Sequence, residues 1–128
     1  MPAVIAFLDD LMFLSRIREA ARGAGLEVRS VRRLPDLLAA ARDGARLVLA
    51  DLDTARLPVL EGLAALRAEP GLAGLTVVGF LSHVHADRAA AGQAAGCSRV
   101  LARSAFVAQL PQLLAEAAQA QPGPSPSR

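Results

Sequence analysis

Acidic side chains stand directly after two short apolar runs of this sequence, where they could bind a cation or accept a chemical group. The run "VIAFL" is followed by Asp9 and Asp10, and the run "LVLA" is followed by Asp51, with Asp53 two residues later. Carboxylate oxygens are the ligands that Mg²⁺ prefers in proteins. Carboxylates held close together can instead repel one another, which raises the pKa of one of them. The chemistry open to these acids therefore depends on whether the fold brings them together.

A second group of reactive side chains lies in "SHVH". Its two histidines, His83 and His85, together with Cys97 are too few and too unfavourably spaced for a structural zinc site. Ser82 and His83 do not form a hydrolase triad with Asp51, because "GFLSH" is not a nucleophile elbow. We therefore expect a protein without enzymatic activity. We expect His83 to cover the acids, where its charge would respond to pH near neutrality.

Length and composition predict one soluble domain. The chain has 128 residues, which is enough to bury a core without disulfides. We expect a domain over residues 1–120 and a disordered tail over residues 121–128, because "QPGPSPSR" has no apolar anchor. No apolar stretch approaches the roughly 20 residues of a membrane span, and the N-terminus lacks the basic start of a secretory signal. A single cysteine fits a reducing cytoplasm.

The high isoelectric point of this chain is not a signal for nucleic acid. The formal net charge is only +2, although the calculated pI is about 9.9. Every basic side chain other than histidine is an arginine, so almost nothing titrates between neutrality and high pH. We interpret the local cluster of Arg29, Arg32 and Arg33 as a solvated rim, in which the aliphatic parts of the side chains pack against the protein surface. We expect neither nucleic acid nor a membrane as a partner.

Hydrophobic patterning predicts five strands that alternate with five helices. The predicted strands cover residues 4–8, 26–31, 46–52, 75–82 and 98–104, and the predicted helices cover residues 11–21, 34–44, 58–69, 86–97 and 110–120. This alternation predicts an α/β fold of the flavodoxin-like, doubly wound kind, with a five-stranded parallel sheet. In the strand order 2-1-3-4-5 the first and third strands are neighbours, so Asp9, Asp10 and Asp51 converge at the ligand-binding edge.

In these motifs the chain resembles the receiver domain of bacterial two-component response regulators, over residues 3–118. "FLDD" resembles the acidic pair that helps that family bind Mg²⁺, and "LVLAD" resembles the run that ends in its phosphoacceptor. "AAGC" and "EGLAAL" resemble the turn before the family's fifth strand and the start of its third helix. The resemblance implies that Asp51 accepts phosphate from a histidine kinase. It also implies that Asp9, Asp10 and Asp51 hold Mg²⁺.

Two switch positions depart from the family. The family has a lysine at the end of the fifth strand, where this chain has Arg103. Arginine carries a planar, forked guanidinium on a long side chain, whereas lysine carries a compact ammonium group. The family also has a hydroxyl side chain at the end of the fourth strand, and the spacing from Gly96 puts Leu81 there, with Ser82 one residue late. These changes resemble those of atypical receivers, which keep the fold and lose or alter phosphorylation.

Two mechanisms stay open. In the first, Asp51 is phosphorylated with Mg²⁺ bound, Arg103 replaces the lysine, and Ser82 supplies the switch hydroxyl. In the second, Arg103 neutralises the acids permanently and interaction alone is the function. We favour the second, because two switch residues are altered while all the acids are kept.

We expect an atypical single-domain response regulator that signals through protein–protein contacts. We expect no output domain after the predicted domain, and we therefore expect the contact to use the segment over residues 92–114. Small side chains in this segment would allow close approach of a partner helix or of a second copy of the chain. A different class, a small-ligand-binding flavodoxin-like module, predicts a concave pocket at the sheet edge instead.

Overall fold

Five parallel strands form one sheet at the centre of the protein. The computed structural model describes residues 3–54, 56–72, 74–82 and 86–119. The strand order is β2-β1-β3-β4-β5, which confirms the predicted fold class. The strands are β1 (Val4–Phe7), β2 (Val28–Val31), β3 (Leu47–Asp51), β4 (Thr76–Leu81) and β5 (Arg99–Ala102). Residues 4–7 of β1 and 47–51 of β3 are buried throughout, as expected for central strands covered on both faces.

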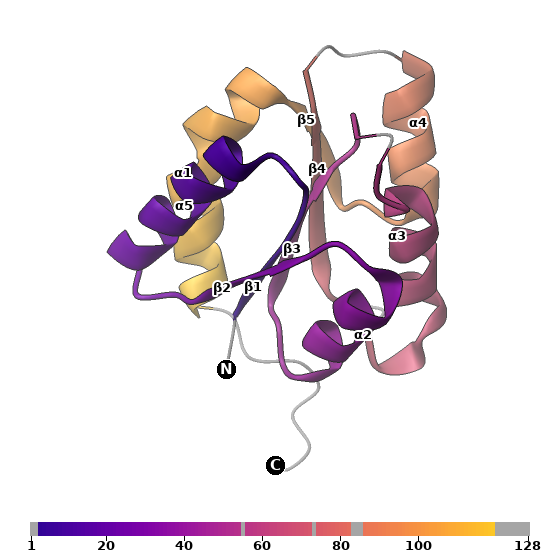
Figure 1. Ribbon diagram of the computed structural model, residues 1–128, viewed down its shortest axis with the longest axis horizontal. Coiled ribbons are helices and arrows are strands. Elements are labelled where there is room, and N and C mark those ends of the chain that lie inside the picture. Colours follow the sequence, from indigo (N-terminus) through magenta and orange to yellow (C-terminus); the bar gives the residue numbers. More distant parts are fainter. Residues whose placement is uncertain (1–2, 55, 73, 83–85, 120–128) are drawn as a thin grey trace.

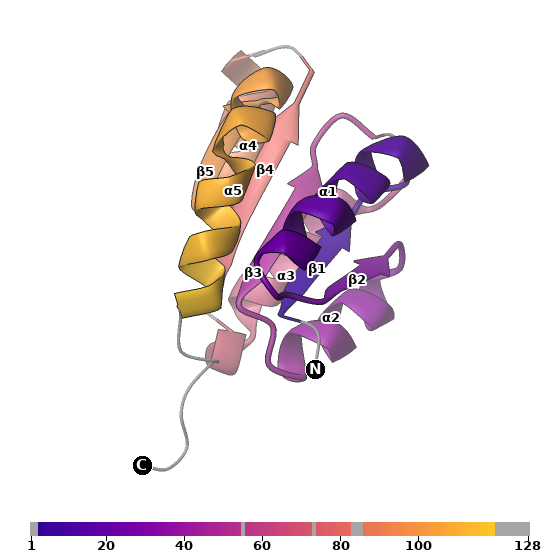
Figure 2. The same cartoon turned by 90° about the vertical axis from the view of Figure 1, so that its left-hand side faces the viewer.

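Helices cover both faces of the sheet (Figures 1 and 2). The helices α1 (Leu11–Gly23) and α5 (Arg103–Gln119) lie on one face. The opposite face is covered by α2 (Leu34–Arg42), α3 (Val59–Ala68) and α4 (Ala86–Ala95), and a 3₁₀ turn over Pro70–Leu72 follows α3. Alternate residues of β1 supply the two cores, since Val4 and Ala6 pack with α1 and α5 while Ile5 and Phe7 pack on the other side.

The start of the last helix differs from its prediction. The prediction of a strand to residue 104 and a helix from residue 110 was wrong, because α5 begins at Arg103 directly after β5. Pro111 lies inside this helix, although proline removes a helical hydrogen bond. The apolar face explains why the helix continues through it, since side chains at helical spacing are buried against the sheet: Phe106, Leu110, Leu113, Leu114 and Ala117.

The turn before β5 has the conformation that its glycine suggests. Gly96 has a φ of 124°, a region that side chains rarely adopt. Arg67 of α3 donates to the carbonyl oxygen of Gly96 from Nε at 2.8 Å and from an NH2 nitrogen at 2.6 Å. These contacts fix the connection between α4 and β5 against α3.

Some expectations from the sequence concern residues that the structure does not describe. His83, His85 and the tail over residues 121–128 are outside the described residues.

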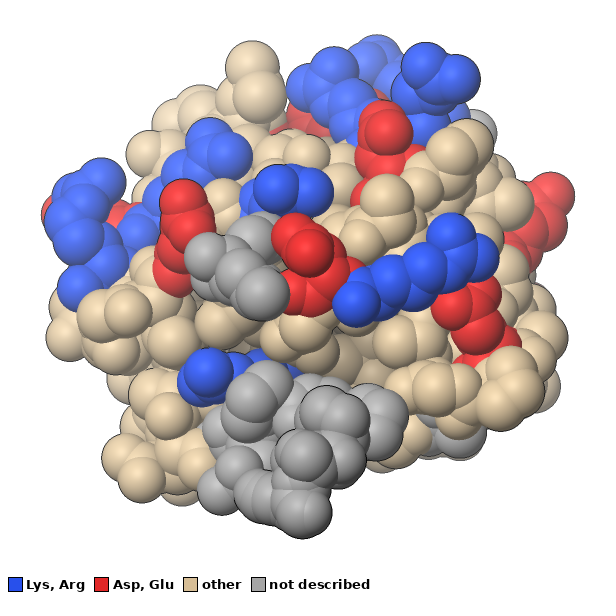
Figure 3. Space-filling model, turned by 90° about the horizontal axis from the view of Figure 1, so that it is seen from below, with Lys and Arg blue, Asp and Glu red and all other residues tan. Residues whose placement is uncertain are grey.

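Within the described ranges, no helix is both long and apolar enough to cross a membrane. Arg29, Arg32 and Arg33 are exposed, as predicted for a solvated rim. Figure 3 shows that arginine and acidic side chains are interspersed on the face seen from below.

Candidate functional site

The predicted acids lie at the carboxyl edge of the sheet. Phe7 of β1 pairs with Ala50 of β3, so Asp9 and Asp10 after β1 lie at the same edge as Asp51, the last residue of β3. Asp10 is also the N-cap of α1, because its Oδ1 accepts a hydrogen bond from the backbone N–H of Phe13 at 3.0 Å. Such a cap satisfies one of the free N–H groups at the start of a helix. One oxygen of Asp10 is therefore committed to folding.

Arg103 brings its guanidinium between two of these acids. Its NH1 nitrogen lies 3.5 Å from Oδ2 of Asp10, and its NH2 nitrogen lies 3.7 Å from Oδ2 of Asp51. These two acids belong to elements far apart in the sequence, and one cation contacts both. Because α5 begins directly after β5, Arg103 reaches this position from the first residue of the helix.

Aromatic rings hold the guanidinium in place. The Cζ atom of Arg103 lies 4.5 Å from the ring centroid of Phe13 and 5.3 Å from that of Phe80. Contacts of this kind stabilise an arginine through the negative ring face. The two phenylalanines pack with Phe106, whose ring stacks on Phe80 with centroids 4.5 Å apart. The Nε of Arg103 is buried and has no hydrogen-bond partner among the described residues, so the position of Arg103 depends on stacking and on the acids.

Asp51 is the buried member of the site. It is 4% exposed, and its Oδ1 accepts a hydrogen bond from the backbone N–H of Asp53 at 2.8 Å. Burial raises the pKa of Asp51, and the charges of Asp53 and Asp9 raise it further. The N–H of Asp53 and the charge of Arg103 act in the opposite direction and lower it. The carboxylate of Asp51 is thus partly desolvated and only partly compensated by its neighbours.

Asp9 has separate partners. The hydroxyl of Thr54 donates to Oδ1 of Asp9 at 3.4 Å, and Arg56 lies 3.6 Å from its Oδ2. The side chain of Arg56 is 85% exposed, so solvent screens this ion pair. Asp9 is nevertheless tied to the loop that follows β3.

The three acids have the right chemistry for Mg²⁺, but their arrangement does not fit an ion that all three would hold. All six carboxylate oxygens of Asp9, Asp10 and Asp51 have partners within the protein. Among the described residues, no group of three acids, histidines or cysteines is placed to hold a metal ion. The guanidinium of Arg103 lies between two of the expected ligands, and Mg²⁺ binding by them stays a prediction.

The structure gives Ser82 hydrogen bonds to Asp53, and it gives none between Ser82 and Asp51. The hydroxyl of Ser82 donates to Oδ2 of Asp53 at 2.6 Å, and its backbone N–H donates to the same oxygen. Arg88 of α4 lies 3.1 Å from Oδ1 of Asp53. The sequence analysis gave no role to Asp53 or Arg88. The sequence did hold a signal for Asp53. It is the second acid after β3, two residues from Asp51, and in an extended segment that spacing places two side chains on the same side.

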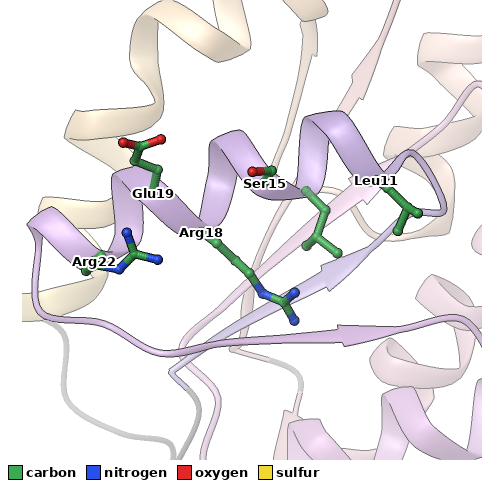
Figure 4. Close-up of a pocket in the computed structure, with 6 residues that line it drawn as sticks. Leu11, Ser15, Arg18, Glu19 and Arg22 are labelled. Atoms are coloured by element: carbon green, nitrogen blue, oxygen red, sulfur yellow. The ribbon is translucent and has the colours of Figure 1, made fainter.

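A shallow depression lies along α1, and none of the acids at the carboxyl edge lines it. Its volume is about 300 Å³. Figure 4 shows that the side chain of Arg18 points from α1 toward β2. The depression is lined by Leu11, Leu14, Ser15, Arg18, Glu19 and Arg22. The acids at the carboxyl edge are not part of it, so it is not the sheet-edge pocket that a small-ligand module predicts.

Exposed apolar side chains lie outside the segment predicted to contact partners. Among the described residues, the large hydrophobic side chains that are exposed are Leu11, Met12 and Leu60. Leu11 and Met12 belong to the first turn of α1, and Leu60 belongs to the first turn of α3. The contact face over residues 92–114 therefore stays a prediction.

Cys97 is expected to react slowly with thiol reagents while the protein is folded. It is 9% exposed, and burial raises its pKa to about 11 from an ordinary value of 9.0. Because the thiolate is the reactive form, this shift lowers the thiolate fraction about 100-fold at pH 8. Labelling with a chromogenic disulfide at pH 8, with and without 8 M urea, measures the difference. A native rate equal to the rate in urea would contradict the burial of this thiol.

Comparison with known proteins shows which solved structures share this fold. No protein-family model matches the chain, and no curated protein matches it. Solved structures do match. The phosphorylated cyanobacterial phytochrome response regulator RcpA has a TM-score of 0.71 at 22% identity, with 97% of each chain covered.

Two further structures agree. A putative response regulator from Chloroflexus aurantiacus has a TM-score of 0.75 at 18% identity, covering 94% of this chain and 100% of the other. The Mn²⁺-bound form of response regulator Rcp1 has a TM-score of 0.73 at 14% identity, covering 98% and 100%. The fold of this chain is therefore that of the receiver domains of response regulators.

Proposed function

We propose that this chain is an atypical receiver, which acts in signal transduction by binding other proteins and not by catalysis. In this proposal Arg103 takes the place of the divalent cation and Asp51 is not phosphorylated. The observation that carries the proposal is the position of the Arg103 guanidinium, 3.5 Å from Asp10 and 3.7 Å from Asp51. A guanidinium between these acids neutralises one of their two charges and lies where a cation bridging them would bind.

The surroundings of Arg103 favour a permanent rather than a transient contact. The rings of Phe13 and Phe80 lie 4.5 and 5.3 Å from the Cζ atom of Arg103, and these contacts favour the observed position of the guanidinium. The side chain of Arg103 is 27% exposed, so most of it is shielded from solvent. Similarity of the fold to response regulators, one of them bound to Mn²⁺ and one phosphorylated, supports a signalling role for the same framework.

Exposure to a small phosphodonor tests this proposal. The purified chain is incubated with acetyl phosphate and Mg²⁺, and its intact mass is measured beside a receiver that is known to be phosphorylated. We expect no gain of the roughly 80 Da that a phosphoryl group adds. A stable gain of that size in the wild type, absent from Asp51→Asn, would show that the site is chemically active and would contradict the proposal.

A further inference from the structure

One carboxylate connects three elements at the rim of the sheet. Asp53, two residues after the end of β3, accepts hydrogen bonds on Oδ2 from both the hydroxyl and the N–H of Ser82, which follows β4. Its other oxygen, Oδ1, lies 3.1 Å from NH1 of Arg88 on α4. Two strand ends and a helix therefore meet at the side chain of Asp53.

The donors around Asp53 are of the kinds that bind oxyanions. A backbone N–H, a hydroxyl and a guanidinium all point at one anionic group, and hydrogen bonds to an ionised acceptor are the stronger kind. Burial acts to raise the pKa of Asp53, but the hydrogen bonds from Ser82 and the charges of Arg88 and Arg103 outweigh it, so the pKa lies below its usual range. The side chain is 21% exposed, so the contacts lie near the surface.

We propose that Ser82 and Arg88 form an anion-binding site whose ligand in the wild type is the chain's own Asp53. The carboxylate oxygens of Asp53 occupy the positions that the oxygens of a free carboxylate or phosphate would take. Because Asp53 is covalently tethered beside the donors, its effective concentration is in the millimolar range or above, and free anions are excluded. This site lies beside Asp51, and the inference holds whether or not Asp51 accepts phosphate.

The internal ligand has a structural consequence. Arg88 lies in the first turn of α4, so its contact with Asp53 ties the start of that helix to the carboxyl ends of β3 and β4. Without the carboxylate, the N–H of Ser82 loses its acceptor and Arg88 loses its ion pair. The amide of Ser82 therefore reports directly on whether the site is filled.

Removal of the internal ligand and its replacement by a free anion test the inference. In Asp53→Ala, amide hydrogen exchange at Ser82, followed by NMR, is expected to be about tenfold faster than in the wild type. Inorganic phosphate, compared with sodium chloride at equal ionic strength, is expected to slow this exchange again and to raise the melting temperature. The wild type should show no such specific response, because its site is already occupied.

Two further variants separate the site from general effects of salt and charge. Phosphate stabilises many proteins by exclusion from their surface, so the comparison that matters is with Asp53→Ala/Arg88→Ala, which should lose the specific response. Asp43→Ala removes one negative charge from an exposed position at the end of α2 and should leave Ser82 exchange unchanged. Equal phosphate effects in the single and double variants, or unchanged Ser82 exchange in Asp53→Ala, would overturn the inference.

Discussion

Arg103→Ala is expected to lower the free energy of unfolding by about 1–3 kcal/mol in metal-free buffer, because it leaves a buried carboxylate without its cation. It should also make stability respond to Mg²⁺. In the variant, Asp10 and Asp51 lose the guanidinium that contacts both of them. A dication could then compensate the two charges, and at tenfold its dissociation constant Mg²⁺ would restore about 1.4 kcal/mol. Urea denaturation at pH 7 with and without 10 mM Mg²⁺ measures both effects.

Arg56→Ala is the matched control for this experiment. It removes the same charge from the same edge, but the Arg56 side chain is 85% exposed, and it pairs with Asp9 at 3.6 Å. Its expected effect on stability is within about 0.5 kcal/mol. If Mg²⁺ stabilised the wild type as much as Arg103→Ala, Arg103 would not be occupying the place of the cation.

Phe80→Ala is expected to destabilise the fold by about 3–5 kcal/mol, which is the range for large aromatic residues in cores. Phe80 is fully buried, its ring stacks on Phe106, and the guanidinium of Arg103 lies 5.3 Å from its centroid. The substitution therefore removes core packing and one wall of the Arg103 site together. Chemical denaturation measures the loss, and a cost below 1 kcal/mol would contradict the packing described here.

Phe7→Ala is the control that separates the two effects of Phe80→Ala, the loss of core packing and the loss of one wall of the Arg103 site. Phe7 is also fully buried, but it belongs to the core on the opposite face of the sheet. We expect a similar loss of stability from Phe7→Ala and no response to Mg²⁺. Phe80→Ala should show part of the Mg²⁺ response of Arg103→Ala, since the guanidinium is no longer held against the acids on one side.

Much of the fold is predictable from the sequence for local reasons. Apolar runs such as that of β3, bounded by glycine, proline and charged residues, are short enough for buried strands and are separated by helical spacing. The parallel arrangement then follows from alternation, and it places the residues after each strand at one edge. This is why the positions of Asp9, Asp10 and Asp51 at a common edge could be predicted.

The boundary between β5 and α5 could not be predicted in the same way. Pro111 is a strong local signal for a helix start, and it outweighed the weaker apolar pattern that precedes it. Burial of Phe106 against the sheet extends the helix back to Arg103. That extension moves Arg103 from a strand end to the first residue of a helix.

The sequence by itself determined the fold class and the edge at which the acids gather. Only the tertiary structure decided which side chains are partners: Arg103 with Asp10 and Asp51, and Ser82 with Asp53 and not with Asp51. The reason is that secondary structure follows from patterns over a few neighbouring residues. Ion pairs and hydrogen bonds instead depend on differences of an ångström or two between groups that lie tens of residues apart in the chain.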